Sequence, residues 1–103
     1  MNTCSLVGRI ERRPSLQRHD TGVIMASFSL CVQEVGRNGK VYSIYVPVEC
    51  YGTLAEGVES LVSGLLVSVT GKLAFRSAEK GRPGALLVLA RSVDRVPATG
   101  EAA

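Results

Sequence analysis

Hydrophobic and polar side chains alternate along most of this chain, which is the period of a strand with one buried face. The alternation predicts five strands, over residues 4–11, 23–33, 41–51, 65–76 and 85–96. The polar stretch 15–20 fits a loop or a short edge strand. Glycines interrupt the first and fourth strands at Gly8 and Gly71, where the missing side chain lets a strand bend sharply.

The second and third strands carry the clearest alternation, and the Asn38-Gly39 turn between them predicts a hairpin. Its side chains divide into two sets that face opposite ways. The inward set is Ile24, Ala26, Phe28, Leu30, Val32, Ile44, Val46, Val48 and Cys50. The outward set is Met25, Ser27, Ser29, Cys31, Gln33, Ser43, Tyr45, Pro47, Glu49 and Tyr51.

One helix is predicted within residues 53–63, where apolar residues recur at helical spacing. Thr53 and Glu56 form a capping-box pattern at its start, and Gly64 can take a left-handed conformation at its end. Five strands with one helix between the third and the fourth is the plan of an OB-fold, a small Greek-key barrel. The predicted fold class is therefore all-β with one short helix, and an open five-stranded sheet is the alternative.

Composition limits the kind of protein. The 103 residues are enough for one domain, expected over 1–96, with a disordered tail over 97–103. Twelve basic and nine acidic residues give a net charge of +3, which permits a polyanionic partner. Three widely spaced cysteines indicate neither a disulfide framework nor a zinc site. No apolar run approaches the ~20 residues of a membrane span, so we expect a cytoplasmic protein without membrane contact.

The sequence shows no catalytic constellation. His19, the single histidine, has no nearby nucleophile or paired carboxylate and is interpreted as a surface residue. No glycine loop of the phosphate-cradling kind is present in the sequence. We therefore expect a binding protein rather than an enzyme, with no cofactor, no metal and no catalytic residue.

Aromatic residues are the first candidates for binding. Tyr45 and Tyr51 share the outer face of one strand, about 20 Å apart at ~3.3 Å per residue. Aromatic rings on an open sheet stack on unpaired bases with little regard to sequence. Ordinary strand tyrosines or a subunit interface are the alternative. Phe75 is a third candidate, although it has the inward parity of Val69 and is expected in the core unless the bend at Gly71 reverses its face.

Basic side chains lie on connections and strand margins, as a groove that follows a phosphate backbone requires. The candidates are Arg9, Arg12, Arg13, Arg37, Lys40, Lys72, Arg76, Lys80 and Arg82. Charged turns are also common in soluble proteins of every kind. Together with the outward tyrosines, however, these charges favour a single-stranded nucleic acid as the partner.

Several segments also carry a resemblance. They are Met1-Asn2 with Leu6-Val7-Gly8-Arg9-Ile10, then Ala26-Ser27-Phe28-Ser29-Leu30, then Tyr51-Gly52 with Leu54-Ala55-Glu56, and finally Thr70-Gly71-Lys72-Leu73 after the strand that begins near Gly64. In this order they resemble the bacterial single-stranded DNA-binding protein family. The resemblance implies an OB barrel that binds single-stranded DNA and assembles into homo-oligomers.

The sequence departs from that family in two respects. The family stacks bases on several tryptophans, and this chain has none. By position Tyr45 and Tyr51 match a Trp and a Phe, whereas Val35 or its neighbours and Ala78 occupy other expected aromatic places, so weaker stacking is expected. The family usually carries a long acidic-tipped tail, but this sequence stops at Ala103. Both departures resemble the tailless, dimeric primosomal replication proteins.

Two functions remain open at this point. The first is sequence-tolerant binding of single-stranded DNA in replication, recombination or repair, with RNA binding as a variant. The second is a primosome-type interaction module whose tyrosines contact proteins. An exposed first strand and the outward Met25 and Cys31 predict a homo-oligomer, tetramer ahead of dimer, and replication proteins are the expected further partners.

Overall fold

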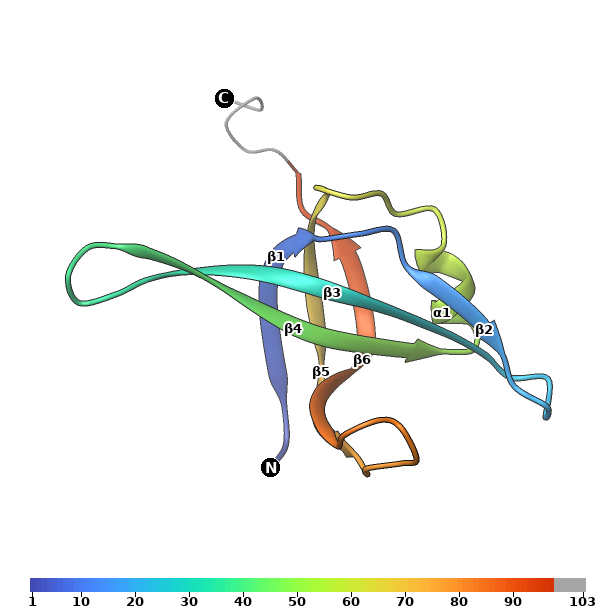
Figure 1. Cartoon of the computed structure of the whole chain (residues 1–103). Coiled ribbons are helices and arrows are strands. Elements are labelled where there is room, and N and C mark those ends of the chain that lie inside the picture. Colours follow the sequence, from blue (N-terminus) through green and yellow to red (C-terminus); the bar gives the residue numbers. More distant parts are fainter. Residues whose placement is uncertain (98–103) are drawn as a thin grey trace.

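The computed structural model describes residues 1–97, and its elements follow the predicted order (Figure 1). The strands are β1 (Cys4–Ile10), β2 (Ser15–Arg18), β3 (Ile24–Val35), β4 (Val41–Tyr51), β5 (Leu66–Arg76) and β6 (Ala85–Arg95), and the helix is α1 (Thr53–Val58). Of the tail expected over 97–103, residues 98–103 lie outside the described part of the chain.

The strands form one sheet that closes into a barrel. Its order is β1-β5-β6-β4-β3-β2, and β1 also pairs with β3, so that β1, β5, β6, β4 and β3 make a ring. The pairings are antiparallel except for a short parallel contact between β4 and β6. The predicted five-stranded OB barrel is confirmed. For residues 15–20 the sequence left open a loop or a short edge strand, and the structure has the strand, since β2 adds four residues along β3.

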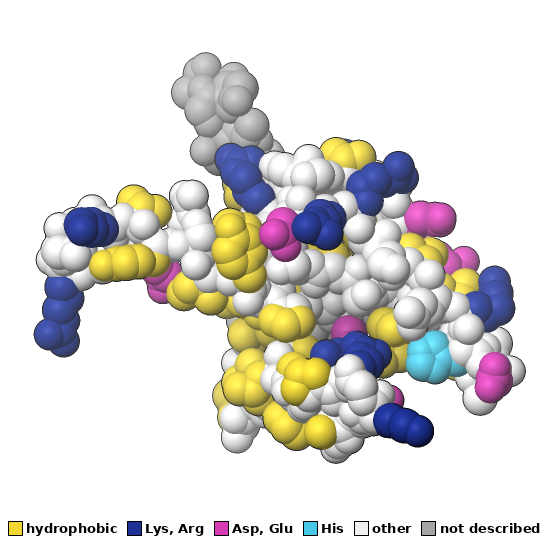
Figure 2. Space-filling view, in the orientation of Figure 1, with side chains coloured by type: hydrophobic (Ala, Val, Ile, Leu, Met, Phe, Trp, Pro, Cys, Tyr) yellow, Lys and Arg dark blue, Asp and Glu magenta, His cyan; other side chains and the backbone are white. Residues whose placement is uncertain are grey.

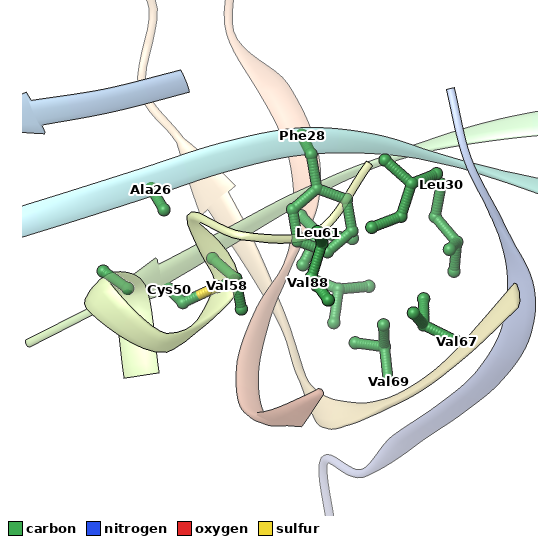
Figure 3. Packing of buried hydrophobic residues seen from close by; sticks show 12 residues of the cluster. Ala26, Phe28, Leu30, Cys50, Val58, Leu61, Val67, Val69 and Val88 are labelled. Carbon is green, nitrogen blue, oxygen red and sulfur yellow. The ribbon is translucent and has the colours of Figure 1, made fainter. Parts of the chain in front are cut away.

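The core fills the barrel with apolar side chains from its strands, from α1 and from Leu61 after the helix (Figure 3). Its buried members are Ile10, Ala26, Phe28, Leu30, Val48, Cys50, Ala55, Val58, Leu61, Val67, Val69 and Val88. Burying one such aliphatic or aromatic side chain stabilises the fold by roughly 1.5–3 kcal/mol. The predicted inward set of the hairpin thus supplies five of these residues, from Ala26 to Cys50.

Two glycines permit close crossings of the backbone. A Cβ atom at Gly8 would collide with the carbonyl oxygen of Cys31, where β1 crosses β3. A Cβ atom at Gly71 would collide with the carbonyl oxygen of Leu89, beside a register shift between β5 and β6. The bends predicted at Gly8 and Gly71 therefore correspond to places where a small barrel has no room for a side chain.

The helix is shorter than the predicted segment and is not capped as predicted. It ends at Val58, and its N-cap is Gly52, which has a φ of 69° and no side-chain cap hydrogen bond. The capping box of Thr53 with Glu56 is wrong, because the chain leaves β4 through a left-handed residue that places the cap one position earlier. Gly64 has the predicted positive φ, 87°, but it lies in a turn six residues after the end of the helix.

The far halves of β3 and β4 extend beyond the barrel as a two-stranded ribbon, which we call the arm (residues 32–44; the projection at the left of Figure 1). Val32 and Ile44 belong to the predicted inward set. Val32 is half-buried, and Ile44 is 47% exposed, so the inward assignment of Ile44 is wrong. The alternation continues past the point at which the barrel ends, and no core lies opposite it there.

Candidate nucleic-acid interface

An open groove of about 880 Å³ runs across the outer face of β3 and β4. The end of β2 and the residue after it form one wall, and the hairpin of β5 and β6 forms the other. The aromatic and charged residues that line the groove are His19, Phe28, Tyr45, Glu49, Tyr51, Phe75, Arg76, Glu79 and Arg82, of which Phe28 is a buried core residue. The groove floor consists of outward side chains of the predicted hairpin, such as Ser27 and Pro47.

Both outward tyrosines line this groove, as their parity on β4 requires. Tyr45 stands opposite Cys31 on β3 and is 56% exposed. Tyr51 stands opposite Met25 and is 43% exposed. Two accessible rings on one face of β4, Tyr45 near its middle and Tyr51 at its end, can each offer a face to an unstacked base.

Tyr51 is held more firmly than its exposure suggests. Its hydroxyl donates a hydrogen bond to Oε1 of Glu49 at 3.2 Å, and its ring lies 6.2 Å from the ring of His19 at an interplanar angle of 60°. Burial, and then the negative charge of Glu49, raise the pKa of the Tyr51 phenol above its ordinary value. The ring therefore stays neutral, and its position is fixed from two sides.

Arg76 reaches the groove from the end of β5 and pairs with Glu49 of β4. Its Nη1 lies 3.1 Å from Oε2 of Glu49, and the two side chains are 30% and 15% exposed. The Nε of Arg76 is buried and has no hydrogen-bond partner within the described chain. The pair ties the floor of the groove to its hairpin wall, and it places a carboxylate beside the one arginine that is partly buried there.

Phe75 is not a core residue, which corrects the prediction from parity. It is 65% exposed and lines the groove. The inward face of β5 is buried at Val67, Val69 and Gly71, but beyond the register shift at Gly71 the strand leaves the barrel with β6. Phe75 stands opposite Leu86, which is also exposed. A third aromatic ring thus lies at the groove, which is the outcome that the sequence left open if the strand bends at Gly71.

The basic candidates near the groove come from β5 and the hairpin loop. Arg76 and Arg82 line the groove directly. Lys72 stands opposite Leu89, a lining residue, so its exposed side chain leaves β5 on the same face. Lys80 is exposed in the loop that joins β5 to β6.

The remaining basic candidates lie elsewhere on the barrel. Arg37 and Lys40 are exposed at the tip of the arm, and Arg12 and Arg13 are exposed after β1. Arg9 lines a separate pocket of about 230 Å³, and its Nη1 donates to the carbonyl oxygen of Gly64 at 2.9 Å. In Figure 2 the Lys and Arg side chains accordingly form separate clusters, one of them at the end of the arm.

Sequence reasoning missed two residues of the groove. His19, interpreted from the sequence as a plain surface residue, packs on Tyr51. Glu49, which the sequence places on the outward face without a role, contacts both Tyr51 and Arg76. Its position two residues before Tyr51 is the available signal, because i and i+2 share one face of a strand. Within residues 1–97 no group of three His, Cys, Asp or Glu side chains is placed to hold a metal.

A five-stranded barrel with this groove belongs to a recognisable class. Counting barrel strands only, the groove covers the second and third strands and is bounded by the hairpin of the fourth and fifth, which is where OB-folds bind oligonucleotides. Comparison with known proteins then defines the family. The chain belongs to the Single-strand binding protein family, whose model matches residues 1–95. The resemblance read from the sequence is confirmed, and since this family consists of non-enzymatic DNA-binding proteins, so is the expectation of a binding protein.

Individual relatives agree with this assignment. The single-stranded DNA-binding protein 1 of Clostridium acetobutylicum is 33% identical over 81 residues, which cover 75% of this chain and 74% of that protein. Single-stranded DNA-binding protein 1 of Staphylococcus aureus is 34% identical over 82 residues, 77% of this chain and 53% of the relative. The crystal structure of a deletion mutant of the single-stranded DNA binding protein from Thermus aquaticus superimposes with a TM-score of 0.81 at 26% identity, covering 97% of this chain. This chain spans about half the length of the last two proteins.

Within residues 1–97, the one helix is not long and apolar enough to cross a membrane.

Proposed function

We propose that this protein binds single-stranded DNA in the groove, with little regard to base sequence. The observation that carries the proposal is the gathering of Tyr45, Tyr51 and Phe75 in one open groove of an OB barrel. Every base has a face on which such rings can stack, and each stacked base contributes roughly 1–3 kcal/mol. The family membership and the names of the relatives support DNA as the ligand.

Cationic side chains complete the proposed site. Arg82, Lys72 and Lys80 stand along the hairpin wall, where a strand lying in the groove would expose its phosphates. The tip of the arm, with Arg37 and Lys40, would contact a strand that continues past Tyr45. Arg9, Arg12 and Arg13 lie on other parts of the barrel and would serve a strand that wraps around it.

Protection of single strands is the activity that follows. Such strands arise in replication, recombination and repair, and we infer that the protein acts in these processes, in the cytoplasm and at the nucleoid. Replication proteins are the expected further partners.

The direct test is quenching of tyrosine fluorescence by oligo-dT. The chain has no tryptophan, so emission from its three tyrosines is not obscured. We expect quenching that saturates and an affinity that falls as salt rises, with oligo-dA and oligo-dC bound within about tenfold of oligo-dT. Absence of quenching at low salt would refute the proposal, and much tighter binding of oligo-U would assign the groove to RNA.

We further infer that the protein is a homo-oligomer, with a tetramer favoured over a dimer. β1 pairs with β3 only at Arg9 and Ile10, so the other edge of its first five residues has no partner strand within residues 1–97. The arm also exposes Val35, Val41 and Ile44. Unpaired strand edges and apolar ribbons are typical of subunit contacts. Sedimentation at micromolar concentration would contradict this inference if it gave the mass of the single chain, 10.9 kDa.

The same experiments address the interaction-module alternative. Loss of assembly in Tyr45→Ala and Tyr51→Ala, with wild-type affinity for oligo-dT retained, would show that the tyrosines serve protein contacts.

A further inference from the structure

The described chain contains a single ion pair, and it lies in the groove. Glu49 uses both carboxylate oxygens there: Oε2 accepts from Nη1 of Arg76 at 3.1 Å, and Oε1 accepts from the hydroxyl of Tyr51 at 3.2 Å. One side chain therefore contacts both a candidate for base stacking and a candidate for phosphate binding. A carboxylate is an unexpected choice for a site that faces a polyanion.

We propose that Glu49 is a positioning residue that masks the charge of Arg76 and fixes Arg76 and Tyr51 together as one rigid surface for a base. The proposal rests on the proposed function, since it assigns base contacts and phosphate contacts to different side chains of the same groove. In this arrangement the region around Tyr51 recognises the base, and the phosphates are left to Arg82 and the lysines of the hairpin wall.

Electrostatics supports this division. A phosphate that approaches Arg76 also approaches the Glu49 carboxylate, so attraction and repulsion largely cancel. The pair is only 30% and 15% exposed, and salt screens such charges less than it screens exposed ones. The guanidinium plane, however, remains available for stacking, which needs no net charge. Arg76 should therefore release no counterion when a strand binds.

The salt dependence of binding measures this directly, because its slope counts the phosphates neutralised, about 0.7 for each on a single strand. Glu49→Gln keeps an acceptor for Tyr51 and removes the negative charge. We expect this variant to bind oligo-dT with a slope steeper by about 0.7, since the released guanidinium takes a phosphate. Arg76→Ala alone should weaken binding without flattening the slope, and adding Arg76→Ala to Glu49→Gln should remove the increment.

Glu79→Gln is the matched control. Glu79 lies at the rim of the groove, and its substitution removes the same charge without releasing an arginine. Its slope should equal that of the wild-type protein. A wild-type slope in Glu49→Gln, an equal increase in Glu79→Gln, or a flattened slope in Arg76→Ala alone would each overturn the masking role.

A second readout needs no DNA and separates positioning from masking. In a Tyr42→Phe and Tyr45→Phe background Tyr51 is the only tyrosine, so the ultraviolet absorbance of the phenolate reports the titration of Tyr51. Burial is the largest cause of the raised pKa of Tyr51, and the charge and the hydrogen bond of Glu49 raise it further, so Glu49→Gln should lower that pKa part of the way toward its ordinary value. An unchanged titration would refute the positioning role.

Failure of the wild-type protein to bind oligo-dT would refute the proposed function itself, whereas intact binding with unchanged slopes refutes the masking role alone.

Discussion

The two halves of the β3–β4 ribbon share one sequence pattern but differ in what surrounds them. Inside the barrel, one face of the ribbon packs in the core, where Leu30 and Val48 are fully buried, and the other face forms the groove. In the arm the alternation continues, yet Val35 is 72% exposed and Ile44 is exposed as well. Alternation defines two faces, but the strands that lie opposite decide whether either face is buried.

The two halves of the ribbon therefore have different roles. The inner half contributes stability through one face and base contacts through the other. The arm extends away from the barrel, because beyond Val32, which packs against the core, its side chains are exposed. Substitutions matched across the two halves can therefore test the division.

The largest effect is expected on folding. Leu30→Ala removes a fully buried side chain and should lower the free energy of unfolding by about 2–5 kcal/mol, including the cavity it leaves. Ile44→Ala, a change of similar size in the arm, should cost less than about 1 kcal/mol, because Ile44 is already 47% exposed and is not part of the core. Urea denaturation of both variants measures the difference. Equal losses would show that the arm is packed in solution, most simply against another subunit.

The next effect is a dependence of stability on pH. Burial, with a smaller contribution from Glu49, raises the pKa of the fully buried Cys50 from 9.0 to about 11. The folded state then holds its proton more tightly than the unfolded state, so this stabilisation is complete below pH 9 and is lost as the pH rises to about 11. The loss should amount to about 2–3 kcal/mol at ~1.4 kcal/mol per pKa unit.

Thermal unfolding across that pH range tests the assignment to Cys50. Cys50→Ala should be less stable at neutral pH but should show a flatter alkaline decline. Cys31→Ala, which removes a half-buried thiol from the opposite face of the ribbon, should keep the full decline. An equally steep decline in Cys50→Ala would place the responsible group elsewhere.

Base stacking should produce an effect of similar or smaller size, this time on binding. Tyr51→Ala is expected to weaken binding to oligo-dT by roughly 1–3 kcal/mol at an unchanged salt slope, because stacking releases no counterions. Tyr51→Phe should largely restore affinity. Tyr42→Ala is the matched change in the arm, where the Tyr42 hydroxyl accepts a hydrogen bond from Asn38 at the turn. Titration by fluorescence anisotropy should find it close to wild type, and an equal loss would extend the stacking surface along the arm.

The smallest effect at fixed salt concerns the tip of the arm. Arg37→Ala combined with Lys40→Ala should lower the salt slope by about 0.7 for each phosphate that the double variant no longer neutralises. The change should appear only with strands long enough to pass Tyr45 and reach the tip, about 17 Å further on for five residues at ~3.3 Å each. Slopes for a short and a long oligo-dT give the comparison. A flattened slope on the short strand would place the tip over the groove itself.

The barrel and the groove floor could be predicted from the sequence because both depend on short-range regularities. Period-2 alternation defines the strands, and the same parity places Tyr45 and Tyr51 together on the outer face. Gly8 and Gly71 mark the crossings, because only glycine fits where one backbone touches another. These features need only neighbours along the chain.

The failed predictions share a different cause. Phe75 and Ile44 keep the inward parity of their strands, but each lies beyond the end of the barrel, and that end is set by how distant strands cross. The pairing of Glu49 with Arg76 joins residues 27 positions apart, so it depends on the angle of β5 against β4. Thr53 has the residue type of a cap, but the backbone has already turned at Gly52.

The parallel contact between β4 and β6 consists of only two residue pairs, Val48 with Val88 and Glu49 with Leu89. Glu49 and Leu89 also line the groove, so one of the two shortest junctions of the barrel, the other being β1 with β3, runs directly beneath the proposed ligand. Local opening of the barrel should separate β4 from β6 more readily than the longer pairings, because few hydrogen bonds join these two strands. A strand of DNA lying across the junction would hold β4 and β6 together and oppose their local opening. Slower exchange of the amide hydrogens at the junction would then report that the groove is occupied.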